Sequence, residues 1–278
     1  VAGKGGEGKT LVSVNLAVAF ALRGERVLYL DLDTGLSGRN PNWGVDTPAS
    51  LAQFWTAGLP LHRLAAPVRL PGGEPGTAAQ VDVITGRMEY LPPGCDPAAL
   101  GEALSASGWH RIVMDLGAGT KRVLFRFCAL ADRLLLVTGP HANALRETVD
   151  IAGTAFLLRR DLPFDVLFNR CPPQAREELA GRLRRTFDGK FMAFEDQGIP
   201  RHGALTNFVS EPKGNLLFHG STLPVLPPGS RRILPEQRES AAGGQFIGLA
   251  EWYRMRAPGA APAWGGLLRR LLTPAPRA

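Results

Sequence analysis

The chain has 278 residues, of which 45% are hydrophobic and 21% are charged. This composition is that of a globular protein with a sizeable core, and it excludes a largely disordered chain. Lys and Arg number 32 against 25 Asp and Glu, so the net charge is +7. A basic chain favours anionic partners such as nucleotides, nucleic acids or acidic lipids, without choosing among them.

The sequence carries no signal for a membrane span, for secretion or for a disulfide framework. No uninterrupted apolar run approaches about 18 residues, and no charged segment leads into an apolar one. The three cysteines, Cys95, Cys128 and Cys171, are scattered and form no CxxC pair. Such spacing argues against a zinc site and predicts a protein of the reducing cytoplasm.

Short apolar runs alternate with helical patterns over the first 170 residues. Runs rich in branched residues predict strands at 27–30, 81–84, 111–114, 134–137 and 164–168. The segments before, between and after them predict helices at 10–22, 97–105, 121–130, 144–158 and 174–187. This alternation predicts an α/β fold, with a mostly parallel central sheet and helices on both faces. Ligands of such sheets lie at the carboxyl ends of the strands.

The alternation of apolar runs and helical patterns ends after residue 195. Between 196 and 237 Gly and Pro predominate, and the pattern assigns no element, whereas a helix is expected between Glu239 and Met255. The segment 257–263 (APGAAPA) has the composition of a linker. We therefore expect one domain over 1–256, a linker over 257–263 and a terminal helix over 264–273.

Residues 3–10 (GKGGEGKT) match the phosphate-loop pattern GxxxxGK[ST]. Glycines in such a loop let backbone N–H groups converge on phosphate oxygens, and the helix that follows adds its N-terminal dipole. The motif opens an amphipathic helical pattern, as the phosphate loop of this fold does. Because only Val1 and Ala2 precede the motif, we expect the strand before it to be incomplete.

The loop also resembles a known family. Its second lysine, Lys4, makes it similar to the KGGxGKT loop of the MinD/ParA ATPases, a deviant form of the Walker A motif. Residues 31–36 (DLDTGL) resemble the family's switch I, and 115–119 (DLGAG) its switch II, closest to the branch of flagellar-number regulators. Residues 169–170 (NR) resemble its adenine-reading position. The resemblance covers about residues 1–187 and implies a P-loop NTPase fold.

The resemblance implies roles for the residues around the phosphates. The loop residues that contact the nucleotide would be Gly3, Lys4, Gly5, Gly6, Glu7, Gly8, Lys9 and Thr10. Lys9 would neutralise the β- and γ-phosphates, Lys4 would reach the nucleotide of a partner subunit, and Gly119 would offer its N–H to the γ-phosphate. Glu7 departs from the pattern, because a small apolar residue is usual there and an acid beside phosphates is unfavourable.

The resemblance also assigns the remaining roles of an ATPase that uses Mg²⁺. Thr10 and Asp115 would hold the metal ion, and Asp31 would support it through water. Asp33 would orient the attacking water, whereas Asn169 and Arg170 would contact the base. The alternative for these acids and for Asn169 is ordinary turn chemistry, since both residue types are common where strands end.

The C-terminal segment has the pattern of a membrane-binding helix. On a helical wheel its apolar residues share one arc of about 140°, at 100° per residue: Trp264, Leu267, Leu268, Leu271 and Leu272. Arg269 and Arg270 flank this arc, where their charges can reach lipid head groups. A segment after a linker at this position is similar to the membrane-targeting helix of the same family. Docking on its own domain is the alternative.

Together these features predict an ATP-hydrolysing spatial regulator. The expected protein dimerises with ATP, binds anionic lipid on the inner face of the cell membrane, and positions or counts an assembly such as flagella or the division site. A partner protein would stimulate hydrolysis. Two alternatives stay open: a DNA-partition ATPase, and a non-hydrolysing scaffold of a secretion or polysaccharide system. Four arginines between 176 and 185 fit either a DNA-binding or a solvated helix face.

Overall fold

The computed structural model of the chain describes residues 6–33, 39–71, 78–86, 91–117, 122–171, 173–197, 216–218 and 241–255. The fold divides into two compact units, residues 1–9 with 118–223 and residues 10–117 with 224–278. We call the first the base-side unit, because it holds Asn169, which the resemblance places at the nucleotide base. We call the second the acid-side unit, because it holds Asp31 and Asp115, and we describe each unit by itself. None of the described helices combines the length and the apolar character needed to cross a bilayer.

The acid-side unit contains a four-stranded sheet in the order β4-β5-β1-β6. Its strands are β1 (Val27–Asp31), β4 (Ala66–Arg69), β5 (Gln80–Thr85) and β6 (Arg111–Asp115). β1 pairs in parallel with both β5 and β6, whereas the edge strand β4 runs antiparallel to β5. Every residue of β1 is buried, as expected for a central parallel strand covered on both faces.

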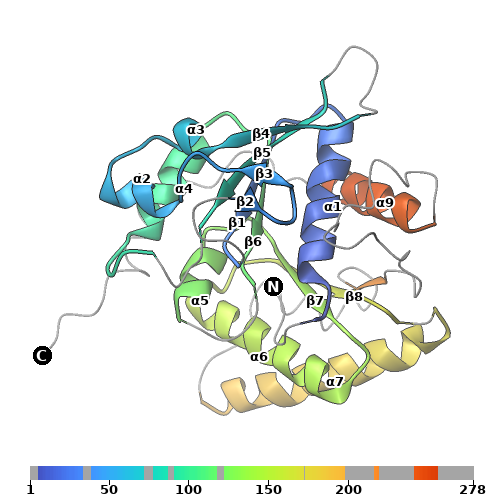
Figure 1. Cartoon of the computed structure of the whole chain (residues 1–278). Helices are drawn as coiled ribbons and strands as arrows, with labels where there is room; N and C mark the ends of the chain where they lie inside the picture. The colour runs from blue at the N-terminus through green and yellow to red at the C-terminus, as the bar shows by residue number, and fades with distance from the viewer. Residues whose placement is uncertain are drawn as a thin grey trace, which may run out of the picture. The chain divides into compact units, whose positions relative to one another are not determined.

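The helices of the acid-side unit cover both faces of this sheet. They are α1 (Lys9–Leu22), α2 (Ala52–Thr56), α3 (Leu61–Leu64), α4 (Pro97–Ala106) and α9 (Ala241–Met255). α1 and α9 lie side by side, and α4 lies across the sheet from them (Figure 1). α4 begins where its sequence predicts, because Pro97 occupies the first turn and the Asp96 side chain accepts the N–H of Ala98. A short hairpin, β2 (Arg39–Asn40) with β3 (Val45–Asp46), completes the unit.

α1 is buried on all sides rather than amphipathic. From Val14 to Leu22 every residue is buried, and Phe246 and Ala250 of α9 are fully buried as well. The sequence pattern predicts an amphipathic helix with one exposed face. That face is covered because α9, whose residues lie more than 200 positions away in the chain, packs beside it. Sequence periodicity alone does not show such a distant partner.

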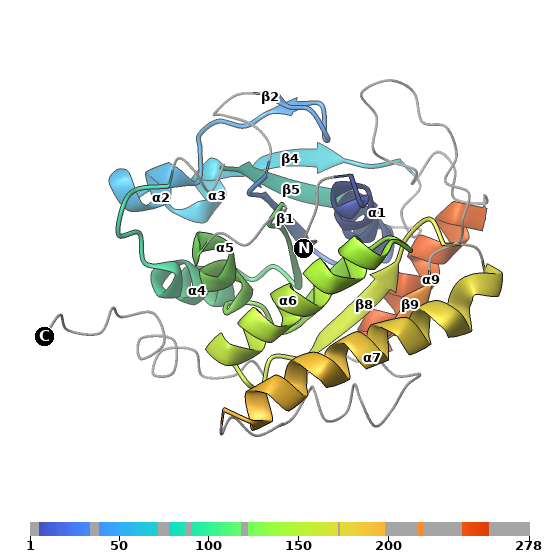
Figure 2. The ribbon, with the colours of Figure 1, turned by 90° about the horizontal axis from the view of Figure 1, so that it is seen from below.

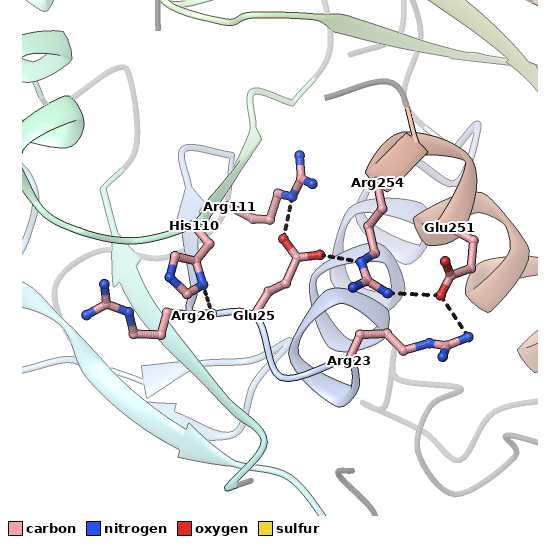
Figure 3. Close-up of polar contacts among 7 residues, drawn as sticks. All are labelled: Arg23, Glu25, Arg26, His110, Arg111, Glu251 and Arg254. Carbon is pink, nitrogen blue, oxygen red and sulfur yellow. Dashed lines mark hydrogen bonds and ion pairs between the residues drawn. The ribbon is translucent and has the colours of Figure 1, made fainter. Parts of the chain in front are cut away.

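Ion pairs fasten α9 to the start of the sheet (Figure 3). The Glu25 carboxylate lies 2.6 Å from Arg111 Nε and 3.3 Å from Arg254 Nε. Glu251 lies 2.8 Å from Arg23 Nη2 and 3.3 Å from Arg254 Nη1. Because the Glu25 carboxylate, just before β1, joins the first residue of β6 to the last turn of α9, these three parts of the chain hold one another.

The base-side unit contains a parallel sheet in the order β7-β8-β9. Its strands are β7 (Leu134–Thr138), β8 (Phe164–Phe168) and β9 (Leu216–Phe218), and its helices are α5 (Arg122–Cys128), α6 (Ala142–Leu158) and α7 (Arg176–Glu195). α6 and α7 run side by side (Figure 2), and α7 packs on β8 through stacked rings. The Phe164 and Phe187 rings are 5.6 Å apart.

All five predicted strands are confirmed, and the six predicted helices are found with shifted ends. The predicted α/β fold with mostly parallel strands is confirmed too. β9 lies in the segment where the sequence pattern assigned nothing, and α7 continues to Glu195 instead of ending near Phe187. The linker 257–263 and the terminal helix lie outside the described residues, so the domain boundaries stay predictions.

Candidate functional site

Two aspartates end neighbouring strands of the acid-side unit. β1 and β6 are parallel and in register, with Asp31 paired opposite Asp115. The N–H of Leu32 donates to the Asp115 carbonyl at 2.9 Å, so the two chains stay together one residue beyond the strands. Both side chains are buried, with exposed fractions of 0% and 3%. The sequence placed these acids at strand ends, and the register now places them side by side.

The Asp115 carboxylate is bound to the first turns of α1. Its Oδ2 accepts hydrogen bonds from Ser13 Oγ and from the Tyr29 hydroxyl, both at 3.1 Å. Ser13 Oγ also lies 3.2 Å from the Thr10 carbonyl and 3.0 Å from the Tyr29 hydroxyl. Ser13 therefore links the backbone of Thr10, the predicted metal ligand, to the Asp115 carboxylate through hydrogen bonds. Ser13 and Tyr29 were not predicted as site residues.

Tyr29 is held as a hydrogen-bond donor. Burial raises its pKa well above 10.0, and the charges of Asp115 and Asp31 raise it further. A phenolate next to two carboxylates in a buried site is unfavourable, so the hydroxyl keeps its proton. The buried Trp43 ring packs edge-on against the Tyr29 ring at 5.1 Å and fixes its position.

Asp31 is surrounded by donors from its own segment of the chain. Its Oδ2 accepts from Asn40 Nδ2 at 2.9 Å and from Asn42 Nδ2 at 3.1 Å, and its Oδ1 accepts from the N–H of Asp33 at 3.2 Å. Asn40 in turn accepts the N–H groups of Asn42 and Trp43. Asp31 therefore fixes the start and the end of the segment between β1 and β3. A role beside a metal ion through water, as predicted, would add to these contacts.

Asp33 is exposed and lies against Gly117. A Cβ on Gly117 would collide with the Asp33 carboxylate, and Gly117 has a φ of +73°. Only glycine suits both demands, because a side chain at this φ is strained and here has no space. The glycine of the DLG motif therefore gives Asp33 its place, a relation that the two separate motifs did not reveal.

In the base-side unit the phosphate loop is bound to the end of β8. Gly6 and Gly8 have φ of +91° and +88°, as a loop that turns its N–H groups inward requires. Asn169 directly follows β8, and its Nδ2 donates to the Glu7 carbonyl at 2.8 Å. A Cβ on Gly8 would collide with the same Nδ2. Among the described residues, Asn169 Oδ1 finds no hydrogen-bond partner although it is buried.

The Glu7 side chain points to the neighbouring strand end. Its carboxylate lies against the α-carbon of Gly139, just after β7. Burial raises the pKa of the Cys171 thiol to about 11, and the charge of Glu7 adds to that increase. The acid that departs from the family pattern is therefore placed beside the β7 and β8 ends of its own unit.

Other predicted residues divide into those the structure describes and those it does not. Lys9 and Thr10 are buried at the start of α1. Arg170 is described with a φ of +57°. The remaining predicted positions lie outside the described residues: Gly3, Lys4, Gly5, Gly119, Trp264, Leu267, Leu268, Leu271 and Leu272.

The chain matches the family described as "CobQ/CobB/MinD/ParA nucleotide binding domain" over residues 1–218. Antiactivator FleN of Pseudomonas aeruginosa is 33% identical over 194 residues, which are 67% of this chain and 66% of that protein. The septum site-determining protein MinD of Thermotoga maritima is 28% identical over 178 residues, 62% of each chain. The matches span about two thirds or less of these relatives.

Solved structures of the same family share the fold. MinD of Pyrococcus horikoshii, complexed with Mg-ADP, superposes with a TM-score of 0.61 at 22% identity, over 90% of this chain and 92% of that chain. The pNOB8 ParA protein bound to nonspecific DNA superposes with a TM-score of 0.60 at 15% identity, over 92% and 96% of the two chains. At such identities the likeness shows the fold alone.

The described geometry suits the chemistry of a bound polyphosphate. Phosphoryl transfer needs charge neutralisation and positioning more than covalent catalysis. In the base-side unit, a loop with two left-handed glycines supplies backbone donors, and the buried Asn169 Oδ1 has no partner among the described residues. In the acid-side unit, Thr10 and Asp115 carry oxygen atoms of the type that Mg²⁺ prefers. No group of three or more His, Cys, Asp or Glu that could hold a metal ion occurs in the described part of the chain. In nucleotide-binding proteins Mg²⁺ is commonly bound through one or two carboxylates together with substrate phosphates, and this needs no such group.

Proposed function

Because the chain belongs to the CobQ/CobB/MinD/ParA nucleotide-binding family, we propose that it is an ATP-hydrolysing spatial regulator. In this proposal it forms a dimer with ATP, binds the inner membrane, and positions or counts a cellular assembly such as flagella or the division site. Its relatives include proteins named for determining septum and flagellum sites. The observation that carries the ATPase assignment is the pairing of Asp31 with Asp115, with Ser13 joining Asp115 to the first turn of α1.

The residues divide the work of hydrolysis among them. The N–H groups of the loop and Lys9 bind the phosphates, while Thr10 and Asp115 hold Mg²⁺, which neutralises phosphate charge when bound. Asp33 is exposed and oriented by Gly117, so it accepts a hydrogen bond from the attacking water and orients it. Ser13 and Tyr29 keep the Asp115 carboxylate in one rotamer.

Dimerisation and membrane binding belong to residues that the structure does not describe. Lys4 reaches the nucleotide of the second subunit, and the apolar arc of the terminal helix enters the lipid interface. One short helix with few apolar side chains attaches weakly, since its folding offsets much of the burial. Two helices on one dimer bind together and tighten attachment by about 10²-fold or more. ATP then controls membrane residence.

The test combines flotation with ATP turnover. Full-length protein is mixed with vesicles of an anionic phospholipid in ATP or in ADP, and bound protein and released phosphate are measured. Leu268→Glu, in the centre of the apolar arc, should abolish ATP-dependent flotation. The matched control is Leu157→Glu, because Leu157 is an exposed leucine of α6. Equal flotation in ATP and ADP would contradict the avidity mechanism, and ATP binding without turnover would favour the non-hydrolysing scaffold.

A groove in the base-side unit favours a second candidate, binding of DNA. It encloses about 330 Å³ between α6 and α7 and is lined by Ala142, Leu145, Arg146, Arg182, Arg185 and Thr186. Three guanidinium groups around one groove suit phosphate oxygens. Of the arginines of α7, Arg182 and Arg185 are in the lining of this groove. Co-sedimentation with duplex DNA in ATP, at two salt concentrations, separates this candidate from the membrane-binding regulator.

A further inference from the structure

We propose that Asn169 is a positioning residue for the phosphate loop, so that one amide group couples recognition of the base to the geometry that binds the phosphates. The inference rests on the proposed nucleotide binding and adds a role beyond contact with the base. It is carried by the contacts of Asn169 within the base-side unit.

The two ends of the Asn169 amide do different work. Nδ2 donates to the carbonyl of Glu7 at 2.8 Å, within the phosphate loop. A carbonyl accepts and never donates, so the amide cannot turn over without placing two acceptors together. The orientation therefore leaves Oδ1 as the free end, and Oδ1 has no partner among the described residues.

Backbone contacts at the end of β8 fix the position of Asn169. Its N–H donates to the Thr138 carbonyl at 2.8 Å, which joins the ends of β7 and β8. Cys171 Sγ contacts the Asn169 carbonyl at 3.2 Å, and the side chain is only 1% exposed. A buried side chain on two adjacent strand ends is a rigid support, so the bond to Glu7 restrains the loop rather than follows it.

The loop is shaped to accept this support. Gly8 has a φ of +88°, and a Cβ there would collide with Asn169 Nδ2. The glycine therefore serves close packing against Asn169 in addition to its backbone conformation. An unfilled acceptor buried at Oδ1 is unfavourable until a donor of the ligand reaches it. Filling it secures the amide orientation that holds Glu7, which is how the base would influence the loop.

The experiment separates loop positioning from base contact by omitting the base. Affinities of wild type and Asn169→Ala are measured for ATP and for inorganic tripolyphosphate, both with Mg²⁺. A residue that only contacts the base would change the ATP affinity alone. We expect the dissociation constant for tripolyphosphate to rise about five- to tenfold as well, the loss of one net hydrogen bond. Asn143→Ala, at an exposed asparagine of α6, is the matched control.

Hydrogen exchange in the absence of any ligand provides a second readout. In Asn169→Ala the amides of residues 6–9 should exchange faster, while those of β7 and β8 keep their protection. A merely structural role would lower protection across the whole unit. Asn169→Ser, whose hydroxyl is too short to reach the Glu7 carbonyl, gives the same comparison if the alanine variant does not fold.

A double-mutant cycle measures the coupling directly. Gly8→Ala should weaken tripolyphosphate binding more in the wild type than in Asn169→Ala, because only the wild type has the colliding amide. Unchanged tripolyphosphate affinity in Asn169→Ala, or unchanged exchange of the loop amides, would overturn the proposal. If the wild type binds neither ligand, the proposed function fails, and the exchange measurement still decides whether Asn169 holds the loop.

Discussion

The strand ends of the two units carry different kinds of polar group. In the acid-side unit, Asp31 and Asp115 are carboxylates whose oxygens accept hydrogen bonds from the same unit. In the base-side unit, Asn169 uses its donor on the phosphate loop, while its buried acceptor has no partner in the part of the chain that the structure describes. At the carboxyl ends of parallel strands, the acid-side unit therefore has carboxylates that receive their hydrogen bonds from the unit itself. The base-side unit has an amide oxygen that finds no donor among the described residues.

This difference separates preorganisation from recognition. A buried carboxylate that receives several hydrogen bonds keeps one position before any ligand arrives, which suits groups that must orient a metal ion or water. An open acceptor on a rigid support has an unfavourable free state and gains when the ligand supplies a donor. We therefore expect substitutions in the acid-side unit to change turnover and stability, and substitution of Asn169 to change affinity.

The largest effect is expected for Asp115→Asn. The variant keeps the shape of the side chain and one acceptor for Ser13 and Tyr29, but it loses the charge that holds Mg²⁺. Turnover of ATP should fall about 10³-fold. Phosphate release measures it, and thermal unfolding checks the fold. Asp96→Asn is the control, since asparagine caps a helix as well as aspartate does. Normal turnover in Asp115→Asn would remove Asp115 from the site.

Asp33→Ala comes next and tests orientation of water. Turnover should fall about 10²-fold, the lower end for a positioned proton acceptor. Because Asp33 is exposed, the free energy of unfolding should stay within about 0.5 kcal/mol of the wild type. ATP affinity should also persist, since water positioning acts mainly on the transition state. A loss of affinity equal to the loss of turnover would show that Asp33 binds the ground state instead.

Asp31→Ala sharpens the claim that the acid-side groups are completed internally. Removing the carboxylate leaves the amides of Asn40 and Asn42 and the N–H of Asp33 without their acceptor, at a cost of about 2–3 kcal/mol in the free energy of unfolding. Chemical denaturation measures this loss. Asn42→Ala, which removes one of these donors and keeps the Asp31 acceptor, should cost less. Equal stability of Asp31→Ala and wild type would contradict the described hydrogen bonds.

The smallest effect is expected for Tyr29→Phe, at about 1 kcal/mol below pH 9. The folded protein holds the phenol proton more tightly than the unfolded chain does, because burial raises its pKa well above 10.0. Stability from this group is therefore complete below pH 10 and decreases as the pH rises above it. Denaturation at pH 8 and pH 11 should show a smaller decrease for Tyr29→Phe. The same decrease in both proteins would assign the alkaline sensitivity to other groups.

Much of the fold was predictable because buried parallel strands read as short apolar runs. β1, β6 and β8 end within one residue of their predicted ends. The edge strand β4 was missed, since it has only four residues and Pro67 lies within it. β9 was missed because a three-residue strand among glycines and prolines has no periodicity to measure.

The site was predictable as far as its residues belong to motifs. The motifs identified Asp31 and Asp115, and the strand register confirms that they are neighbours. Ser13 and Tyr29 belong to a helix and a strand that looked purely structural, and their hydroxyl groups matter only because packing brings them to Asp115. A polar residue within an otherwise apolar run was the signal that could have marked both. The bond from Asn169 to Glu7 joins positions 162 residues apart, a contact that no local pattern contains.

The ion pairs around Glu25 also affect the order in which the protein folds during its synthesis. The acid-side sheet is complete in sequence once β6 has been made, but its helix α9 comes from the far end of the chain. Until α9 leaves the ribosome, α1 lacks this cover and Glu25 lacks its ion pair with Arg254. Contacts between distant segments form slowly, and exposed apolar surface invites aggregation meanwhile. The nascent chain therefore depends on its last described helix, and truncation before Ala241, which removes all of α9, should yield a protein that chaperones retain.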